Sequence, residues 1–283
     1  MTRARAAILC GALLGGMASA PPGYGCTILN VTEGGRTYVA ANEDWSTDRF
    51  SIRVQPAKGS EHGRVLLGVD DPDRYPFSGF NDQGLFFDLA SVPPAPGLEP
   101  DPTKETHDNP VYVRMLASCS DVTEAVEFLA RFNVSGLKRH HVMVVDRSGA
   151  SAVIEGTPQG QVAIRKTGRH QVITNFLLST ADPTATQSGR FAVADRMLRE
   201  MGEPTIDALR SILSATRSTS PGYPTVYSSI LDLHDLRLHL YYKADYDRCV
   251  VLDLREALQR GRSLRRLSSF FPPLVPLSGR HGP

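Results

Sequence analysis

The chain has 283 residues, 41% hydrophobic and 22% charged, which suits one globular domain with a sizeable core, or at most two small ones. Its 31 Lys and Arg residues nearly balance its 30 Asp and Glu residues, so the net charge of +1 gives no reason to expect nucleic acid or an anionic membrane surface as a partner. No internal stretch reaches the roughly 18 apolar residues of a membrane-spanning helix, and no internal repeat indicates a solenoid or a propeller.

The first 20 residues differ in composition from the rest of the chain. A short basic start is followed by an apolar run rich in Gly and Ala, and then by Ala18-Ser19-Ala20, a small-residue pattern typical of secretory cleavage sites. We therefore predict a signal peptide over residues 1–20 and a secreted or periplasmic protein; a buried first helix would suit so many small residues poorly. Pro21 is unfavourable directly after such a cut, so either the cut lies elsewhere or a second step removes a short pro-segment, residues 21–25.

Four cysteines are present, at positions 10, 26, 119 and 249. The first would leave with the signal peptide, and the remaining three are an odd number for an oxidising compartment. A disulfide between Cys119 and Cys249 and two separate buried thiols both stay open. In either case Cys26 is left as a free thiol close to the start of the secreted chain.

In the first half of the chain, strands are predicted to precede two helices. Runs rich in β-branched residues predict a hairpin with strands at 26–31 and 36–41, joined by Glu33-Gly34-Gly35. We expect further strands at 64–69 and 85–89, a loop rich in proline and charge at 92–107, and helices at 110–117 and 122–132. Ser120 or Asp121 is expected to cap the second helix.

The second half repeats the order of strands, two helices and strands. We expect strands at 141–145, 152–155, 161–165 and 170–174, helices at 189–201 and 205–215, strands at 225–231, 236–241 and 249–252, and a short helix at 254–259. Short turns between neighbouring strands imply antiparallel sheets, and paired helices favour an α+β layering over alternating βαβ units. We place the domain at 26–260 and expect a loosely ordered tail at 261–283, where prolines are frequent.

A cysteine at the start of a chain can act as a nucleophile without a histidine. Its own α-amino group has an ordinary pKa of about 8 and the thiol one of about 8.5, so the amine can serve as the nearby base. Gly25 would leave the peptide bond before Cys26 unshielded. Cysteines near a signal cut are more often structural or lipidated, but Gly23-Tyr24-Gly25 lacks the apolar and small residues that precede a lipidation site.

Several polar stretches at strand and helix ends are ordinary when each is taken alone. Ala41-Asn42-Glu43-Asp44-Trp45 closes a strand and offers acids that could hold a new α-ammonium group, although its composition favours a simple polar strand end. Asn175 follows a strand, and Arg190 starts a helix, where a cation disfavoured by the helix dipole often serves a partner. His140 and His141 point to opposite faces of a strand, so no metal site is predicted, and no motif indicates a cofactor.

Taken in order, these pieces resemble the linear amide C–N hydrolases, the family of choloylglycine (bile salt) hydrolases, penicillin V acylase and related acyltransferases. The resemblance extends from Cys26 to about residue 258 and rests on Cys26-Thr27, Asn42-Glu43-Asp44-Trp45, Gly79-Phe80-Asn81-Asp82-Gln83-Gly84-Leu85, Phe87-Asp88, Cys119-Ser120-Asp121-Val122-Thr123-Glu124-Ala125, Thr174-Asn175, Gly189-Arg190-Phe191 and Thr225-Val226-Tyr227-Ser228. It implies a four-layer αββα N-terminal-nucleophile fold with two antiparallel sheets.

The resemblance also implies roles for particular residues. Cys26 would be the nucleophile with its freed amine as base, and Asp44 the acid that hydrogen-bonds both. Asn175 would help to bind the oxyanion, and Arg190 would favour the thiolate and stabilise negative charge. The implied reaction is the hydrolysis of a linear amide in a small molecule through an acyl-thioester, without a cofactor. Further candidates for binding substrate or oxyanion are Asn42, Asn81, Ala90 and Ser91.

The sequence departs from the bile salt hydrolases at two places. They carry an arginine where this chain has Ala41, and an oxyanion-hole asparagine where it has Ala90 or Ser91. Losing one oxyanion donor typically costs about 10²–10³ in rate, so either other donors compensate or activity is low. Bile salts are therefore disfavoured as substrates. An acyltransferase on the same fold, a weakly catalytic binding protein, self-cleavage before Cys26 and a homo-oligomer all stay open.

Overall fold

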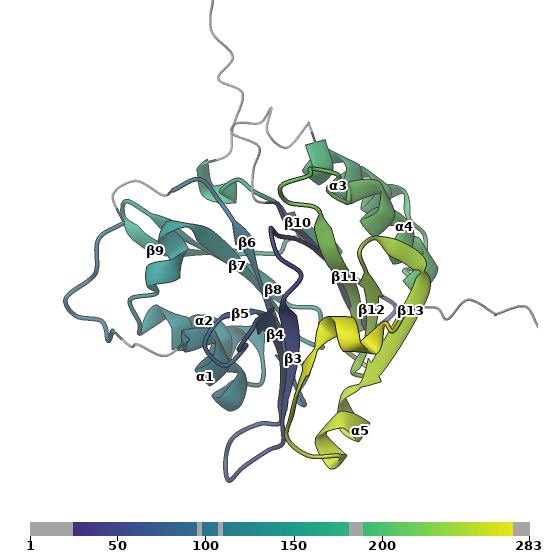
Figure 1. Ribbon diagram of the computed structural model, residues 1–283. Coiled ribbons are helices and arrows are strands. Elements are labelled where there is room, and N and C mark those ends of the chain that lie inside the picture. Colours follow the sequence, from purple (N-terminus) through teal and green to yellow (C-terminus); the bar gives the residue numbers. More distant parts are fainter. Residues whose placement is uncertain (1–24, 95–97, 107–109, 181–188, 274–283) are drawn as a thin grey trace, which may run out of the picture.

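The computed structural model of the protein describes residues 25–94, 98–106, 110–180 and 189–273. Its strands form two sheets in which every neighbouring pair is antiparallel (Figure 1). The expected signal peptide and nearly all of the expected pro-segment fall on residues 1–24, which lie outside the described ranges, so both stay expectations. Within the described residues, no helix has the length and apolar character needed to cross a membrane.

The first sheet has six strands in the order β10-β1-β2-β11-β12-β13. Their bounds are β1 Thr27–Glu33, β2 Arg36–Asp44, β10 His170–Ile173, β11 Thr225–Asp232, β12 Arg237–Tyr242 and β13 Asp245–Asp253. The predicted hairpin is present: Thr27 pairs with Asn42 at its open end and Glu33 with Arg36 at its turn. Gly34 and Gly35 have φ of 57° and 77°, the left-handed backbone that a tight hairpin turn requires.

The second sheet has eight strands in the order β14-β3-β4-β5-β6-β7-β8-β9. Their bounds are β3 Phe50–Gln55, β4 Arg64–Val69, β5 Pro76–Asn81, β6 Phe86–Ser91, β7 His140–Val145, β8 Ser151–Thr157, β9 Gly160–Arg165 and β14 Ser263–Arg266. The sequence pattern did not predict β3 or β5. The latter begins with a proline, contains a glycine and ends in a polar turn, so its composition hid a strand that is buried at nearly every position.

The prediction that the domain ends at residue 260 is wrong. Strand β14 pairs with β3 along Ser263–Arg266, and the fully buried Leu267 begins a 3-10 turn, Leu267–Phe270, which packs on the same strand. An edge strand tolerates the charged side chains that made this segment resemble a solvated tail. Residues 274–283, the rest of the expected loose tail, lie outside the described ranges.

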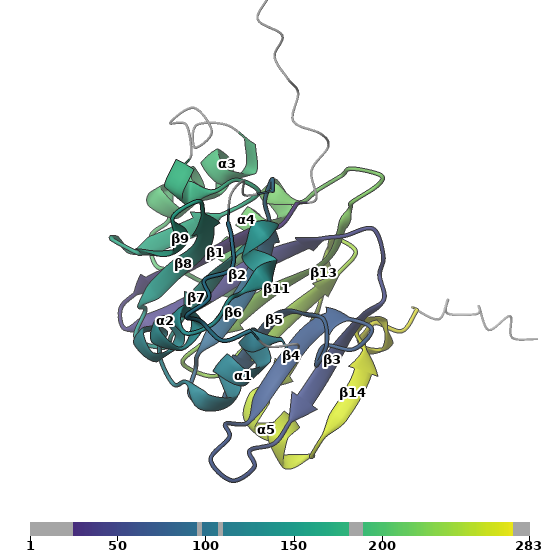
Figure 2. The ribbon, with the colours of Figure 1, turned by 90° about the vertical axis from the view of Figure 1, so that its left-hand side faces the viewer.

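Helices cover the outer face of each sheet (Figure 2). Helices α1 (Val111–Ser118) and α2 (Val122–Ala130) pack on the eight-stranded sheet, and α3 (Gly189–Glu200) and α4 (Ile206–Thr216) pack on the six-stranded one. Asp121 caps α2 by accepting a hydrogen bond from the Glu124 N–H. The short α5 (Leu254–Gln259) connects β13 to β14 across the two sheets.

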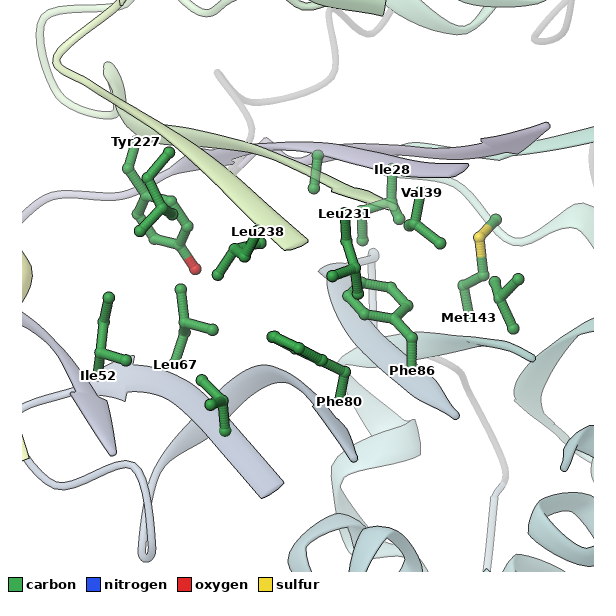
Figure 3. Packing of buried hydrophobic residues seen from close by; sticks show 14 of the residues in the cluster. Ile28, Val39, Ile52, Leu67, Phe80, Phe86, Met143, Tyr227, Leu231 and Leu238 are labelled. Atoms are coloured by element: carbon green, nitrogen blue, oxygen red, sulfur yellow. The ribbon is translucent and has the colours of Figure 1, made fainter. Parts of the chain in front are cut away.

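Strands that are buried on both faces explain the continuous apolar runs in the sequence. In β1, Ile28 faces the core between the sheets, whereas Leu29 and Val31 face α3 and α4. Figure 3 shows the core between the sheets, with Ile28 and Tyr227 opposite Ile52 and Phe80. Helix layers and sheets together make a four-layer α+β sandwich, which confirms the predicted αββα architecture.

Candidate active site

Cys26 lies directly before β1, with its side chain in the core between the sheets and 4% of its surface exposed. Cys26 lines a cavity of about 460 Å³. Mostly apolar and aromatic side chains line this cavity, among them Trp45, Tyr75, Phe77 and Leu89. Cys26 therefore adjoins a space large enough for a small molecule, and mostly apolar walls are usual for a ligand site.

Arg190, the second residue of α3, reaches over the peptide bond that precedes Cys26. One guanidinium nitrogen donates to the Gly25 carbonyl oxygen at 3.1 Å and to the Asp44 carboxylate, and the other donates to Asn175 Oδ1 at 2.7 Å. A Cβ atom at residue 25 would lie 2.2 Å from the guanidinium, so only glycine allows this approach. The predicted Arg190, Asp44 and Asn175 thus meet beside Cys26.

Asp44 ends β2 with its carboxyl group fully buried. It accepts hydrogen bonds from Arg190 and from the Thr225 hydroxyl. Burial raises the pKa of Asp44 to about 6, and the nearby Arg190 charge opposes that rise. The backbone N–H of Asp44 hydrogen-bonds the Cys26 sulfur and thereby favours the thiolate.

Asn175 lies just after β10, and both ends of its amide are engaged. Its Nδ2 donates to the Ser91 carbonyl oxygen at 2.7 Å while its Oδ1 accepts from Arg190. Ser91 lines the cavity, and Ala90 is fully buried in the core that also holds Cys26. Neither residue presents a side-chain amide. Among the described residues, the Asp44 backbone N–H donates to the Cys26 sulfur, and the Arg190 guanidinium donates to the carbonyl oxygen of Gly25.

The structure adds Glu43, which the sequence analysis treated only as part of a polar strand end. The Cys26 thiol donates to Glu43 Oε2 at 3.3 Å, and Glu43 is 1% exposed. Burial raises the pKa of Glu43 to about 8, and burial together with the charges of Glu43, Asp44 and Asp88 raises the pKa of the Cys26 thiol. The hairpin register could have found Glu43, because the position beyond the Thr27–Asn42 pair sets Cys26 opposite Glu43.

No family model matches the chain, and no curated protein sequence matches it. Solved structures do: a conjugated bile acid hydrolase from Clostridium perfringens has a TM-score of 0.66 at 17% identity, over 85% of this chain and 96% of its own. A penicillin V acylase from Agrobacterium tumefaciens has a TM-score of 0.57 at 19% identity, over 81% and 87% of the two chains.

A third solved structure, an N-acylethanolamine-hydrolyzing acid amidase ortholog from Caenorhabditis elegans, has a TM-score of 0.53 at 15% identity, over 81% of this chain and 99% of its own. The fold is that of the N-terminal-nucleophile hydrolases. The fold that the family resemblance implied is therefore confirmed, whereas identities below a fifth leave the roles of individual residues to be argued from the geometry.

Within this N-terminal-nucleophile fold, Asn42 does not belong to the site. Strand alternation turns its side chain to the outer face of the sheet, where Nδ2 donates to the Leu213 carbonyl at 2.9 Å and to Thr216 Oγ1 at 3.1 Å. Its Oδ1 accepts from Ser228 and Tyr246. Asn42 fastens α4 to the sheet, so its selection as a substrate or oxyanion candidate was wrong.

Asn81 is also placed elsewhere. It ends β5, is fully buried, and donates to the carbonyl oxygens of Leu116 and Cys119 at 2.9 and 2.8 Å. Its Oδ1 accepts from the N–H groups of Gln83 and Leu85. All four hydrogen bonds hold the turn after β5 against the end of α1, which leaves none for an oxyanion.

The remaining cysteines and the paired histidines have separate surroundings. Cys119 is buried beneath α1 and α2, whereas Cys249 is exposed on β13, and both are free thiols. His141 is buried between Glu155 and the Thr174 carbonyl, and His140 hydrogen-bonds Tyr112 at the cavity wall. In the described part of the chain, no group of three or more His, Cys, Asp or Glu side chains is arranged to hold a metal ion.

Proposed function

We propose that the protein hydrolyses a linear amide in a small molecule, with Cys26 as the nucleophile after the Gly25–Cys26 bond has been cut. One observation carries this proposal. Cys26 lines a cavity, and the carbonyl oxygen of the residue before it is already held by the Arg190 guanidinium. An attacking atom, a bound carbonyl and a cation aimed at it are the parts that acyl transfer requires.

The Gly25 carbonyl indicates where a substrate carbonyl would bind. When residues up to Gly25 have left, the guanidinium N–H that now donates to the Gly25 oxygen is free for another acceptor. A substrate amide oxygen in the same place would receive a charge-assisted hydrogen bond, which strengthens as the oxygen becomes an oxyanion. Arg190 would thus take over part of the task that an asparagine in place of Ala90 or Ser91 would perform.

The proposed cycle uses the α-amine that cutting exposes. The amine accepts the thiol proton, the sulfur attacks the amide carbon, and the leaving amine takes the proton as the C–N bond breaks. Water then hydrolyses the acyl-thioester and restores the thiol. Asp44 would hold the α-ammonium, a role supported by the hydrogen bond from its backbone N–H to Cys26.

The lining of the cavity supports an apolar acyl group. Trp45 and Phe77 meet edge to face with ring centroids 4.9 Å apart, and Leu89 and Val111 line the same space. Burying apolar surface against such walls favours binding at about 25 cal/mol per Å². The signal peptide predicted over residues 1–20 supports action outside the cytoplasm, in the medium or the periplasm.

The test combines mass spectrometry with a panel of acyl amides. The exported protein should begin at Cys26, an apolar acyl amide should be hydrolysed, and a slow substrate should leave its acyl group on Cys26 as a mass increment. Cys26→Ala should retain the fold and lose about 10⁴-fold or more in rate. An active chain that still carries residues 21–25 would refute the proposal. An added amine that diverts the acyl group from water would instead identify an acyltransferase.

A further inference from the structure

A pair of buried carboxyl groups lies close to Cys26, between the two sheets. Glu43 comes from β2 of the six-stranded sheet and Asp88 from β6 of the eight-stranded sheet, and each is 1% exposed. Glu43 Oε2 accepts the hydrogen bond from the Cys26 thiol at 3.3 Å. The amide hydrolysis proposed above makes no use of either acid.

The two acids lie close enough to share a proton. Glu43 and Asp88 hydrogen-bond each other, and no N–H or hydroxyl of the described residues donates to the buried Glu43 Oε1, so the bond between them needs a proton on one carboxyl. Asp88 also accepts from the Leu89 N–H at 2.7 Å. Burial raises the pKa of both acids, and like charges so close together do not both ionise easily.

The groups that surround the pair add no positive charge. Asp44 neighbours Glu43 on β2, the Cys26 thiol approaches from the start of β1, and Tyr227 of β11 lies beside Ser78 of β5. Figure 3 shows the Tyr227 hydroxyl directed toward the eight-stranded sheet. Neither Glu43 nor Asp88 forms an ion pair with a cation in the described ranges, so a proton taken up by Glu43 relieves negative charge.

The uncut chain lacks the base that the mature protein would use. Before the Gly25–Cys26 bond breaks, the Cys26 nitrogen is an amide, which has no lone pair available to accept a proton. The Gly25 carbonyl is nevertheless already polarised by Arg190, and the thiol already donates to a carboxyl group. The parts for an internal acyl shift are therefore assembled in the uncut chain, with a different base.

We propose that Glu43 is the general base by which the chain cuts its own Gly25–Cys26 bond, and that Asp88 is the positioning residue that holds Glu43 against the thiol. This rests on the proposed function, because it assumes that Cys26 has to become the first residue. It assigns to Glu43 a step that the α-amine cannot perform, since cutting is what creates the amine.

The step balances as follows. Glu43 takes the thiol proton, the sulfur attacks the Gly25 carbonyl carbon, and Arg190 stabilises the oxyanion. The C–N bond then breaks, and the proton passes from Glu43 to the departing Cys26 nitrogen, which leaves a thioester and a free amine. Water hydrolyses the thioester, releases Gly25 as a carboxylate and restores the thiol. No oxidant, metal or co-reactant takes part.

The test follows self-cleavage of the full chain made by cell-free translation, with mass spectrometry at timed intervals and across pH. Loss of a general base typically costs 10²–10⁴-fold, so Glu43→Gln should slow the loss of residues 1–25 by about 100-fold or more. The wild-type rate should rise with pH as the acid pair loses its proton, and Glu43→Gln should lose that rise. Asp88→Asn is the matched control, because its amide N–H can still donate to Glu43; it should slow cleavage by less than about tenfold.

A second chain separates this proposal from the proposed function. In it, a removable fusion partner replaces residues 1–25, so that an added protease exposes Cys26 directly. In this pre-cut protein, Glu43→Gln should slow amide hydrolysis by a factor at least ten times smaller than the factor by which it slows self-cleavage in the full chain. The reason is that the α-amine now supplies the base. Self-cleavage at the wild-type rate and pH profile in Glu43→Gln would overturn the inference, as would an Asp88→Asn chain as slow as Glu43→Gln.

The two proposals fail in different ways. If the wild-type full chain never cuts itself but the protein pre-cut at Cys26 hydrolyses amides, the inference is overturned and the amidase stands. If self-cleavage depends on Glu43 as expected but the pre-cut protein is inactive on every amide, the inference is supported and the amidase proposal fails.

Discussion

Glu43 and Asp44 are adjacent in β2, yet their carboxyl groups lie in opposite surroundings. Asp44 meets the Arg190 guanidinium and the Thr225 hydroxyl at the end of the sheet. Glu43 points between the sheets and meets a second acid, Asp88, together with the Cys26 thiol. Both acids are buried, but only one of them has a cation as a partner.

Because of this difference, Asp44 and Glu43 can perform different chemical roles beside the Cys26 sulfur. A carboxylate paired with a cation stays charged and can hold an ammonium or a guanidinium in place. A carboxyl group buried with another acid holds a proton at neutral pH and can exchange it with the thiol. Burial alone therefore does not determine what an acid does beside a nucleophile; the charge of the next group does.

Removing the Arg190 cation should have the largest effect on catalysis. Arg190→Ala should lower kcat/KM for amide hydrolysis by about 10²–10³-fold, because the carbonyl loses its charged donor. It should also destabilise the fold by up to about 3 kcal/mol, since Asp44 stays buried without its partner. The pKa of Asp44 would rise further above about 6, which steady-state rates measured from pH 5 to 8 would detect.

Arg190→Lys is the control for this prediction. It keeps the charge but loses the forked geometry that reaches Gly25, Asp44 and Asn175 together. An intermediate loss of activity is expected. An Arg190→Ala protein as active as the wild type would show that the Asp44 side of the thiol takes no part in catalysis.

Crowding the same side should have a smaller effect. Gly25→Ala places a Cβ atom 2.2 Å from the guanidinium, so Arg190 or the scissile carbonyl has to move. A misplacement of about 1 Å can cost about 10²-fold, and we expect self-cleavage to slow by that amount. The pre-cut protein lacks residue 25, so its rate of amide hydrolysis should not change. Gly168→Ala is the matched control, because no atom lies within 4 Å of its added Cβ.

The acid pair can be probed through stability. Because the folded-state pKa of Glu43 is raised to about 8 from an ordinary value near 4.5, the folded protein holds a proton that the unfolded chain releases. Its contribution to stability is complete below pH 4.5 and is lost as the pH rises toward 8. The wild-type Tm should therefore fall between pH 5 and 8, by about 2–4 °C for each kcal/mol.

Glu43→Gln should flatten this dependence, because glutamine does not titrate. Differential scanning calorimetry of both proteins at half-unit steps of pH measures the difference between their slopes. Parallel curves would mean that Glu43 is ionised in the folded protein throughout this range. The raised pKa and the shared proton would then both be wrong.

The hairpin alone accounts for much of what could be predicted. A tight Gly-Gly turn fixes which residues of 27–33 and 36–42 face each other, and counting one step further sets Glu43 opposite Cys26. The family resemblance of the ordered motifs predicted that Asp44, Asn175 and Arg190 lie at one site with Cys26. Strand alternation could also have shown that neighbouring residues of 42–44 cannot all face one site.

Contacts between the sheets could not be predicted in this way. Asp88 reaches Glu43 only because β6 and β2 lie face to face, and no local pattern specifies which strands of two sheets oppose each other. Strand β5 was not predicted because proline and glycine weaken its pattern. The structural role of Asn81 at the end of this strand was therefore not predicted either. Strand β14 was missed because its charged side chains suit an edge and also suit a solvated tail.

The smallest effect on catalysis is expected from the third polar residue of the same strand end. Asn42→Ala removes four hydrogen bonds with α4, Ser228 and Tyr246, and leaves buried groups unpaired, at a cost of about 1–3 kcal/mol in unfolding free energy. Urea denaturation should show this loss, while kcat per folded molecule should change little, because the side chain faces away from Cys26. A fall in kcat as large as that of Arg190→Ala would mean that the outer face of β2 affects the reactivity of the Cys26 sulfur as strongly as the cation does. The contrast between residues 43 and 44 would then no longer explain the site.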